Sequence, residues 1–406
     1  MTMAKTINDP VHGFITIPHG LLLDTVSHPL MQRLTRIKQL GLSSFVYPGA
    51  QHTRFQHSIG AYHLTSEAIQ SLARKGIFIF DSEAEAVEAA ILMHDIGHGP
   101  FSHVLENTLI HGIDHEEISL KMMEVINNDF NGRLNLAICI FKNQYNKHFL
   151  HQLISSQLDM DRLDYMQRDS FFTGVQEGAI GAQRILKMLN VVDDNLVIEA
   201  KGVYSIENYL ISRRTMYWQV YLHKTVVAAE KVLINLLRRA KHLANKGEEL
   251  FASPALAYFL YNDVTDRIFR EDDTALRYYS ALDDNDIWTS VKVWLNGKDK
   301  ILSTLANNLI NRKLYKVEVA DTPFDEDRIE KLRKTLSEKL DIPIEDTDYF
   351  FSTDSINKHT YDMEGDNINI LTKDDKICEI CGTSDMLNAA LHSKQPPKYL
   401  LAYQRC

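Results

Sequence analysis

The sequence predicts a mainly α-helical protein that carries a small C-terminal lobe of mixed α and β structure. Up to about residue 310, apolar residues recur at helical spacing between short turns. After about Asn311 the composition changes, and segments that alternate between apolar and polar residues appear. A chain of 406 residues is long enough for one large domain and a smaller one. We therefore expect a helical bundle over residues 1–310 and an α+β lobe over residues 311–406.

One expected helix of the larger domain, residues 82–94, shows the pattern on which the others also rest. Ala86, Ala90 and Met93 lie on one helical face, and Ser82 is a plausible N-cap. Glycines and a proline follow and end the helix. Further helices are expected at residues 116–128, 149–157, 205–243 and 255–269. The third of these is long enough to be a buried helix of a bundle.

The C-terminal lobe is expected to contain four strands and two helices. The expected strands are residues 313–320, 349–353, 367–372 and 399–404, and the expected helices are residues 325–340 and 384–391. The resulting order, β-α-β-β-α-β, is typical of a ferredoxin-like fold with a four-stranded sheet.

Composition and charge limit the classes of protein to consider. The net charge of −10 argues against broad attraction to nucleic acids or acidic membranes, so a phosphorylated substrate needs a local cluster of cations. The chain contains no apolar run of about 18 residues, and its first residues do not resemble a secretory signal. The four cysteines are widely scattered, which favours the reducing cytoplasm over a disulfide framework.

Seventeen histidines are more than a protein core needs, and several of them fall into two short stretches. His94 and Asp95 are adjacent at the end of an expected helix, so both reach one ion only if it lies near that helix end. A third and a fourth ligand then come from other helices, and His57 and Asp161 are the best candidates. Imidazole and carboxylate ligands without thiolate suit divalent Mn, Fe, Zn, Ni or Mg.

Simpler interpretations compete with some of these signals. Any single histidine is more often a surface residue or a hydrogen-bonded core residue, and an isolated His-Asp pair occurs by chance in many proteins. The ordered combination of His, His-Asp and Asp carries the metal assignment. Cys378 and Cys381 form one CxxC pair without a second. His392 and Cys406 would complete four zinc ligands, but a tight turn with free thiols is the simpler interpretation.

Several longer motifs surround these residues. They are NDPVHG at residues 8–13, QRL at 32–34, IKQLG at 37–41, PGA at 48–50, RFQHS at 54–58, HDIGHGPFSH at 94–103, the run 159–169, and HK at 223–224. On these motifs the sequence resembles the HD-domain deoxynucleoside triphosphate triphosphohydrolases, over roughly residues 5–230. The resemblance implies the helical HD-domain fold for the larger domain, whereas the C-terminal third matches only in general layout.

The resemblance also implies a reaction and the residues that perform it. The metal ligands of the family correspond to His57, His94, Asp95 and Asp161. The family hydrolyses a dNTP to a deoxynucleoside and inorganic triphosphate, by attack at the α-phosphorus with the help of a divalent ion. By resemblance, His103 protonates the leaving 5′-oxygen, and His98 and His115, with Glu116 beside it, support the attacking water.

The substrate-binding residues of the family also have counterparts. Phosphate contacts correspond to Arg54, Arg162 and Arg213. Residues that hold the 3′-hydroxyl and exclude a 2′-hydroxyl correspond to Gln39, Tyr165 and Asp169, and those that flank the sugar and base to Leu40 and Tyr221. Arg162 stands where the family has a lysine, so the charge is kept although a guanidinium is not equivalent to an ammonium. The alternatives are solvated helix surfaces for the arginines and core packing for the tyrosines.

Departures from the family pattern leave other functions open. An aspartate and an arginine that recognise an activating guanine nucleotide correspond here to Ser27 and Thr35, and Tyr217 replaces a histidine on the base side. We therefore expect no strict dependence on GTP, although another nucleotide activator stays open. The alternatives to a dNTP substrate are a nucleoside monophosphate or guanosine tetraphosphate, or a nucleotide-binding regulator without catalysis. The resemblance further implies a homo-oligomer, either a dimer or a tetramer.

Overall fold

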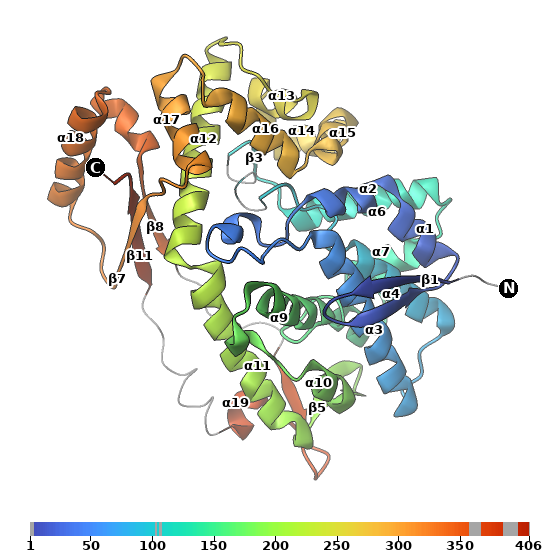
Figure 1. Cartoon of the computed structure of the whole chain (residues 1–406). Coiled ribbons are helices and arrows are strands. Elements are labelled where there is room, and N and C mark those ends of the chain that lie inside the picture. The colour runs from blue at the N-terminus through green and yellow to red at the C-terminus, as the bar shows by residue number, and fades with distance from the viewer. Residues whose placement is uncertain (1–3, 102–103, 105–107, 357–366, 385–396, 406) are drawn as a thin grey trace.

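The structure is a computed structural model of the chain, and it describes residues 4–101, 104, 108–356, 367–384 and 397–405. Helices dominate it, and the strands form small separate sheets, as Figure 1 shows. The prediction of a mainly helical protein with a small strand-containing C-terminal lobe is confirmed. Within the described residues, no helix combines the length and the apolar character that crossing a membrane requires.

Three helices form the centre of the larger part, and they lie side by side in Figure 1. They are α3 (Arg54–Arg74), α4 (Asp81–Met93) and α9 (Met160–Thr173), and α3 packs against both of the others. Thr53 and Gln56 form a capping box that fixes the start of α3. Asp159 caps α9, which ends at Gly174 in the left-handed conformation with φ of 76°.

Other helices surround this centre. Before α9 they are α1 (Leu21–Ser27), α2 (Pro29–Arg33), α6 (His115–Asp129), α7 (Asn135–Phe141) and α8 (His148–Gln152). After α9 they are α10 (Ala182–Met188), α13 (Pro254–Tyr261), α14 (Asp266–Glu271), α15 (Asp273–Ala281), α16 (Asp284–Trp294) and α17 (Lys300–Ile310). The helices expected at residues 82–94 and 116–128 correspond to α4 and α6. The expected helix 255–269 is divided into α13 and α14 by the short strand β6 (Val264–Thr265).

The long helix expected at residues 205–243 is also divided, which corrects the prediction. The structure has α11 (Val203–Met216), a π-helical turn at Tyr217–Tyr221, and α12 (Lys224–Asn245). The ring of His223 accepts a hydrogen bond from Thr225 N at 3.1 Å and so caps the new helix. A hydrophobic pattern shows that a segment is helical, but it does not reveal where one turn gains a residue. Turns of the π type occur frequently at functional sites.

The strands of the C-terminal lobe depart from the expected ferredoxin-like sheet. The lobe contains three antiparallel strands in the order β7 (Lys316–Ala320), β11 (Lys398–Tyr403) and β8 (Phe351–Ile356), with α18 (Glu326–Leu340) beside them. The expected strand at residues 367–372 corresponds to β9 (Asn369–Leu371), which does not belong to this sheet. The prediction of a four-stranded sheet was therefore wrong. A short helix, α19, spans Ile380–Thr383, and residues 385–391 of the expected helix lie outside the described part of the chain.

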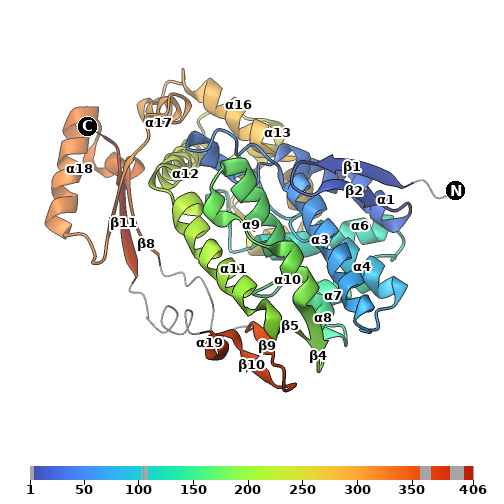
Figure 2. The same ribbon diagram turned by 60° about the horizontal axis from the view of Figure 1, so that its bottom comes forward.

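Strand β9 instead joins the larger part of the protein. It pairs in parallel with β5 (Asn195–Glu199), in a sheet of order β10-β9-β5-β4 that also contains β10 (Ile377–Glu379) and β4 (Leu189–Val192). Figure 2 shows these strands beneath α10 and α11, away from β8 and β11. Ile368 and Ile370 are buried there. Alternation of buried and exposed residues is the same in either sheet, so the sequence pattern does not select the partner strand.

Two small pairings complete the sheets. Near the N-terminus, β1 (Lys5–Asp9) and β2 (Gly13–Ile17) form an antiparallel hairpin. Strand β3 (Ile110–His111) pairs in parallel with β6. Buried apolar residues from the hairpin, the helices and the C-terminal lobe all belong to one cluster. The helices that carry the site described next are therefore braced from several sides.

Candidate metal centre and active site

Three helices each bring one potential metal ligand to the same point. His57 lies in the first turn of α3, His94 directly follows α4, and Asp161 lies in the first turn of α9. Gly60 lets α9 approach α3, because a Cβ atom there would stand 2.0 Å from Asp164 Oδ1. Gly97 lets α6 approach in the same way, because a Cβ atom there would stand 2.2 Å from the carbonyl oxygen of His115. A side chain at Gly60 would displace the buried side chains of Asp164 and Arg168, and one at Gly97 would collide with the backbone of α6.

The ligand atoms of these three residues lie close together. His57 Nε2 is 3.3 Å from His94 Nε2 and 2.9 Å from Asp161 Oδ1, and His94 Nε2 is 3.3 Å from the same oxygen. All three atoms fall within 4.8 Å of one another. Two imidazoles and a carboxylate at this spacing could hold a divalent metal ion.

Asp95, the fourth predicted ligand, stands at the edge of this cluster. One of its oxygens is 3.5 Å from His94 Nε2 and the other is 3.8 Å from His57 Nε2. The second of these oxygens also accepts a hydrogen bond from Arg54 Nη1. Burial raises the pKa of Asp95, but that guanidinium and the nearby ring of His94 outweigh burial and hold the pKa well below its usual range. Asp95 is therefore ionised beside the cluster, and its role as the fourth ligand stays a prediction.

Both histidines present the ring nitrogen that faces the cluster because the other nitrogen is occupied. His57 Nδ1 is 2.8 Å from Asp164 Oδ2, and His94 Nδ1 is 2.7 Å from the carbonyl oxygen of Ile91. Such contacts fix the orientation of metal-ligating histidines. Burial disfavours the charged ring of His57, but Asp161 and Asp164 outweigh it and raise its pKa to about 10 in the metal-free protein. The site therefore favours a positive charge, either a proton or a metal ion.

The predicted proton-transfer residues fall into different surroundings. The rings of His98 and His115 are stacked, with centroids 3.9 Å apart, and His98 Nε2 is 3.3 Å from Asp95 Oδ1. Burial and the nearby charge of Arg54 lower the pKa of His98 to about 3, so this ring is neutral at pH 7. Glu116 points to solvent from α6. His103 lies outside the described residues.

One of the three predicted phosphate-binding arginines contacts Asp95, and the other two lie near Tyr165 of α9. Arg54 is buried beside Asp95. Arg162 donates from Nη1 to Asp159 Oδ2 at 2.7 Å, and Arg213 donates from Nη1 to Gln157 Oε1 at 2.9 Å. Burial raises the pKa of the Tyr165 hydroxyl to about 12, and the positive charges of Arg213 and Arg162 oppose this rise. The local concentration of cations that a phosphorylated substrate requires is therefore present in an acidic protein.

The residues predicted for the sugar line the side next to α9. Asp169 is buried, and its two oxygens lie 2.8 Å from His52 Nε2 and 2.8 Å from the hydroxyl of Tyr221. The rings of Tyr165 and Tyr221 meet edge to face at 6.2 Å. The side-chain oxygen of Gln39 is buried without a hydrogen-bond partner among the described residues. A buried acceptor of this kind is completed by a donor from a ligand or from water.

Leu40 and Tyr217, the remaining predicted contacts, are both half-buried. Leu40 precedes a 3₁₀ turn, Gly41–Phe45, and packs against the core. Tyr217 begins the π-helical turn and meets the ring of Trp218 at 5.9 Å. The turn spans Tyr217 to Tyr221, so it sets the spacing between two residues that the resemblance assigns to the substrate.

Sequence reasoning missed several residues that hold the site together. His52 stacks on Phe172 at 4.5 Å while it contacts Asp169. Asp164 and Arg168 are fully buried on α9. A signal was available for α9: the polar residues Asp161, Asp164, Tyr165, Arg168 and Asp169 recur at spacings of three and four. A helix whose polar stripe faces the core carries a site rather than a solvated surface.

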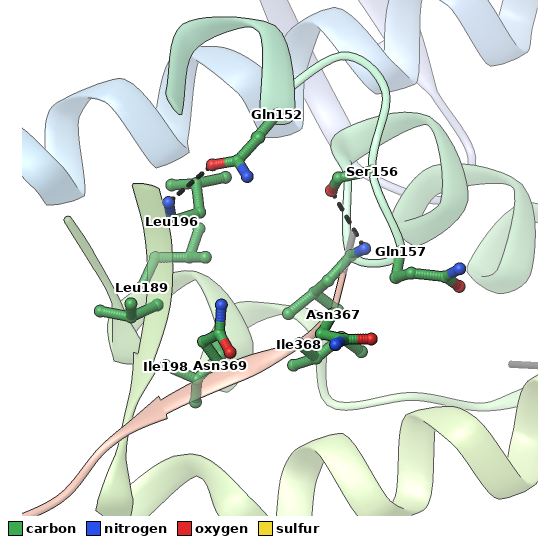
Figure 3. Close-up of a pocket in the computed structure, with 11 residues that line it drawn as sticks. Gln152, Ser156, Gln157, Leu189, Leu196, Ile198, Asn367, Ile368 and Asn369 are labelled. Atoms are coloured by element: carbon green, nitrogen blue, oxygen red, sulfur yellow. Dashed lines mark hydrogen bonds between the residues drawn. The ribbon is translucent and has the colours of Figure 1, made fainter. Parts of the chain in front are cut away.

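A separate small pocket lies between the loop after α8 and strands β4, β5 and β9 (Figure 3). Its lining includes the amides of Gln152, Gln157 and Asn369 and the apolar side chains of Leu189 and Ile198. None of these lining residues belongs to the cluster of His57, His94 and Asp161, but one of them, Gln157, accepts a hydrogen bond from Arg213.

Comparison with known protein families gives two matches. The HD domain matches residues 54–169, and the HD associated region matches residues 180–251. The first range contains the four predicted metal ligands, His57, His94, Asp95 and Asp161. The second contains Arg213, Tyr217 and Tyr221.

Similar proteins come from bacteria and from animals. The crystal structure of a phosphohydrolase from Bacteroides thetaiotaomicron is 62% identical, with a TM-score of 0.97 over 99% of this chain and 100% of that chain. An uncharacterized protein of Bacillus subtilis is 32% identical over 416 residues, which cover 99% of this chain and 92% of that protein. Deoxynucleoside triphosphate triphosphohydrolase SAMHD1 of Homo sapiens is 30% identical over 317 residues, which are 66% of this chain and 50% of that protein. This chain thus spans about half the length of the human relative.

Proposed function

The chain belongs to the HD-domain phosphohydrolases, and we propose that it hydrolyses deoxynucleoside triphosphates to a deoxynucleoside and inorganic triphosphate. The observation that carries the proposal is the cluster of His57, His94 and Asp161, with arginines on its rim. The name of the human relative supports the choice of substrate, since that protein is a deoxynucleoside triphosphate triphosphohydrolase.

In the proposed complex, different side chains bind the phosphates, the sugar and the base. A divalent ion bound by His57, His94, Asp95 and Asp161 supplies Lewis-acid polarisation of a phosphoryl oxygen. Arg54, Arg162 and Arg213 neutralise the triphosphate, whose charge the protein's own net charge of −10 would otherwise repel.

The sugar and the proton transfers use the remaining residues. Gln39 accepts a hydrogen bond from the 3′-hydroxyl, which completes its buried oxygen. Tyr165, together with Asp169 held by His52 and Tyr221, closes the sugar side against a 2′-hydroxyl, and Leu40 and Tyr217 flank the sugar and base. The stacked pair His98 and His115 orients the attacking water, and the 5′-oxygen takes its proton from His103.

The phosphate product distinguishes this reaction from its alternatives. We expect the purified protein, supplied with Mn²⁺ or Mg²⁺, to release triphosphate from dNTPs and to act poorly on NTPs and nucleoside monophosphates. Anion-exchange chromatography of the products measures this directly. Pyrophosphate or orthophosphate as the first product would contradict the proposal, and turnover of monophosphates or guanosine tetraphosphate alone would favour a different nucleotide substrate.

Activity is expected without GTP. Ser27 and Thr35 are both exposed, and the Thr35 hydroxyl donates to the carbonyl oxygen of Gln32 at 2.6 Å. Neither side chain offers the carboxylate or the guanidinium with which the family recognises an activating guanine. Initial rates of dATP hydrolysis should therefore differ by less than about twofold with and without GTP, a change below 0.5 kcal/mol. A lag phase that only GTP abolishes would contradict this expectation. Assembly into a dimer or tetramer stays a prediction.

A further inference from the structure

A chain of buried polar contacts connects the N-terminal hairpin with the metal ligand His57. It begins at Asp164, whose two oxygens are both shared. Oδ2 lies 2.8 Å from His57 Nδ1 and accepts Arg168 Nε at 2.8 Å. Oδ1 lies 2.6 Å from His12 Nε2 and accepts Arg168 Nη2 at 2.9 Å. A carboxylate bound by four donors at once has little freedom to turn, and it fixes the ring of His57 in the same way.

Arg168 extends the connection to the hairpin. Its Nη1 donates to Asp9 Oδ2 at 2.7 Å and its Nη2 donates to Asp9 Oδ1 at 3.3 Å, so one guanidinium bridges two carboxylates. The side chains of Arg168, Asp164 and Asp9 are at most 3% exposed. Buried charges of this kind are retained in proteins when their partners are present, and removal of one partner is costly.

Asp9 also shapes the turn that presents His12. Its Oδ1 accepts the backbone N–H groups of Val11 and His12, both at 3.0 Å, in a short loop between β1 and β2. The hairpin is anchored to α3, because Ile15 and Ile17 are buried and the hydroxyl of Tyr62 donates to the carbonyl oxygen of Thr16 at 3.2 Å. The ring of His12 is therefore held against Asp164 from the side opposite to the metal cluster.

We propose that Asp9 and His12 of the N-terminal hairpin are positioning residues of the metal site, acting on His57 through the buried Asp164–Arg168 pair. The network joins two carboxylates, one guanidinium and the ring of His12, and it holds the carboxylate of Asp164, a negative charge, directly behind the ring of His57. Such charge raises the basicity of a ligating imidazole and fixes the tautomer that leaves Nε2 directed at the ion. The hairpin thus sets the affinity for metal although it contributes no ligand. This inference rests on the metal site of the proposed function, but not on the identity of the substrate.

The test is the affinity of the intact chain for Mn²⁺, measured without substrate by electron paramagnetic resonance of the free ion. Removal of the direct partner of a metal-ligating histidine typically weakens binding by about 10- to 100-fold. Because His12→Ala leaves that partner, Asp164, in place, we expect it to weaken Mn²⁺ binding by about 10-fold, the lower end of this range. His12→Gln keeps an N–H donor at the end of the side chain and should restore most of the affinity. His63→Ala is the matched control, since the ring of His63 lies 5.3 Å from that of His12 and outside the hydrogen-bonded network.

The outcomes separate positioning from simple stabilisation. Equal Mn²⁺ affinity of His12→Ala and His63→Ala, or no recovery in His12→Gln, would overturn the proposal. Should His12→Ala fail to fold, Asp9→Asn supplies the test, with an expected loss of affinity in folded protein as judged by circular dichroism. Because no nucleotide is present, these results do not depend on whether dNTPs are the substrate, and a wrong substrate assignment would leave them unchanged.

Discussion

Asp161→Ala is expected to abolish both metal binding and hydrolysis while the helical fold is kept. The carboxylate of Asp161 lies 2.9 Å from His57 Nε2 and 3.3 Å from His94 Nε2, so it is the negative group common to both rings. Burial opposes its charge, but these two histidines lower the pKa of Asp161 below its ordinary value. An alanine leaves two imidazoles without the oxygen ligand between them. Of the four proposed ligands, the variant loses the carboxylate oxygen that lies nearest to both rings.

Isothermal titration with Mn²⁺, the hydrolysis rate and far-ultraviolet circular dichroism together test this expectation. The control is Glu124→Ala, which removes an exposed carboxylate from α6 and should leave all three measurements unchanged. Full metal content and full activity in Asp161→Ala would refute the assignment of the site. A loss of helical signal would point instead to a structural role for Asp161 at the start of α9.

Arg33→Met is expected to cause the largest loss of stability in the region next to the site. Arg33 is 1% exposed, and no carboxylate accepts its hydrogen bonds among the described residues. Instead it donates from Nε to the carbonyl oxygen of Leu282 at 3.1 Å and from Nη1 to those of Ile96 at 3.3 Å and His98 at 2.8 Å. These hydrogen bonds connect the loop after His94 with the turn between α15 and α16.

Two effects oppose each other in this variant. Each buried carbonyl that loses its donor costs about 1–3 kcal/mol. Burial lowers the pKa of Arg33, which shows that its charge is poorly solvated, so methionine also removes an unfavourable charge. We expect the first effect to dominate, with a net loss of about 2–4 kcal/mol. The free energy of unfolding, obtained from urea titration, measures the difference.

Arg36→Met provides the matched control for Arg33→Met. Arg36 Nε lies 2.5 Å from Asp283 Oδ2, a shorter contact than any made by Arg33, but its side chain is 47% exposed. Exposed ion pairs contribute about 0–1 kcal/mol, so Arg36→Met should lower the free energy of unfolding by less than about 1 kcal/mol. Equal losses in the two variants would show that burial of Arg33 is not what makes it important.

The sequence predicts helices well where a single face is apolar. Helix α4 lies within a residue of the expected range, but Ser82 is not its N-cap: the helix begins after Phe80, whose backbone N–H is accepted by Glu83. Two predictions were wrong for the same physical reason, because the features concerned depend on tertiary neighbours rather than on local sequence. The π-helical turn of Tyr217–Tyr221 interrupts a continuous apolar pattern, and β9 pairs with β5 although its own residues would suit the other sheet equally.

The same distinction between local sequence and tertiary neighbours applies to the residues of the site. Residues that perform chemistry belong to recognisable motifs, and the structure brings His57, His94 and Asp161 together as those motifs predict. Asp95 stands within 4 Å of both histidines. His52, which holds Asp169 in place, lies outside the motifs, and Asp164 lies within the run 159–169 but was given no role by the resemblance. Their roles follow from contacts between residues far apart in the sequence. His57 and Asp164 are 107 residues apart, and His52 and Asp169 are 117 residues apart.

The parallel pairing of β9 with β5 has a consequence for any attempt to divide the protein into fragments. A shortened chain that stops at residue 310 loses the strand that covers one edge of β5. Backbone N–H and C=O groups next to the buried Val197 and Ile198 would then face water in an extended, apolar segment. Such edges recruit strands from neighbouring molecules and cause aggregation. The C-terminal third therefore protects the larger part from self-association through this edge, and insolubility of a truncated chain would reflect a lost neighbour rather than a damaged active site.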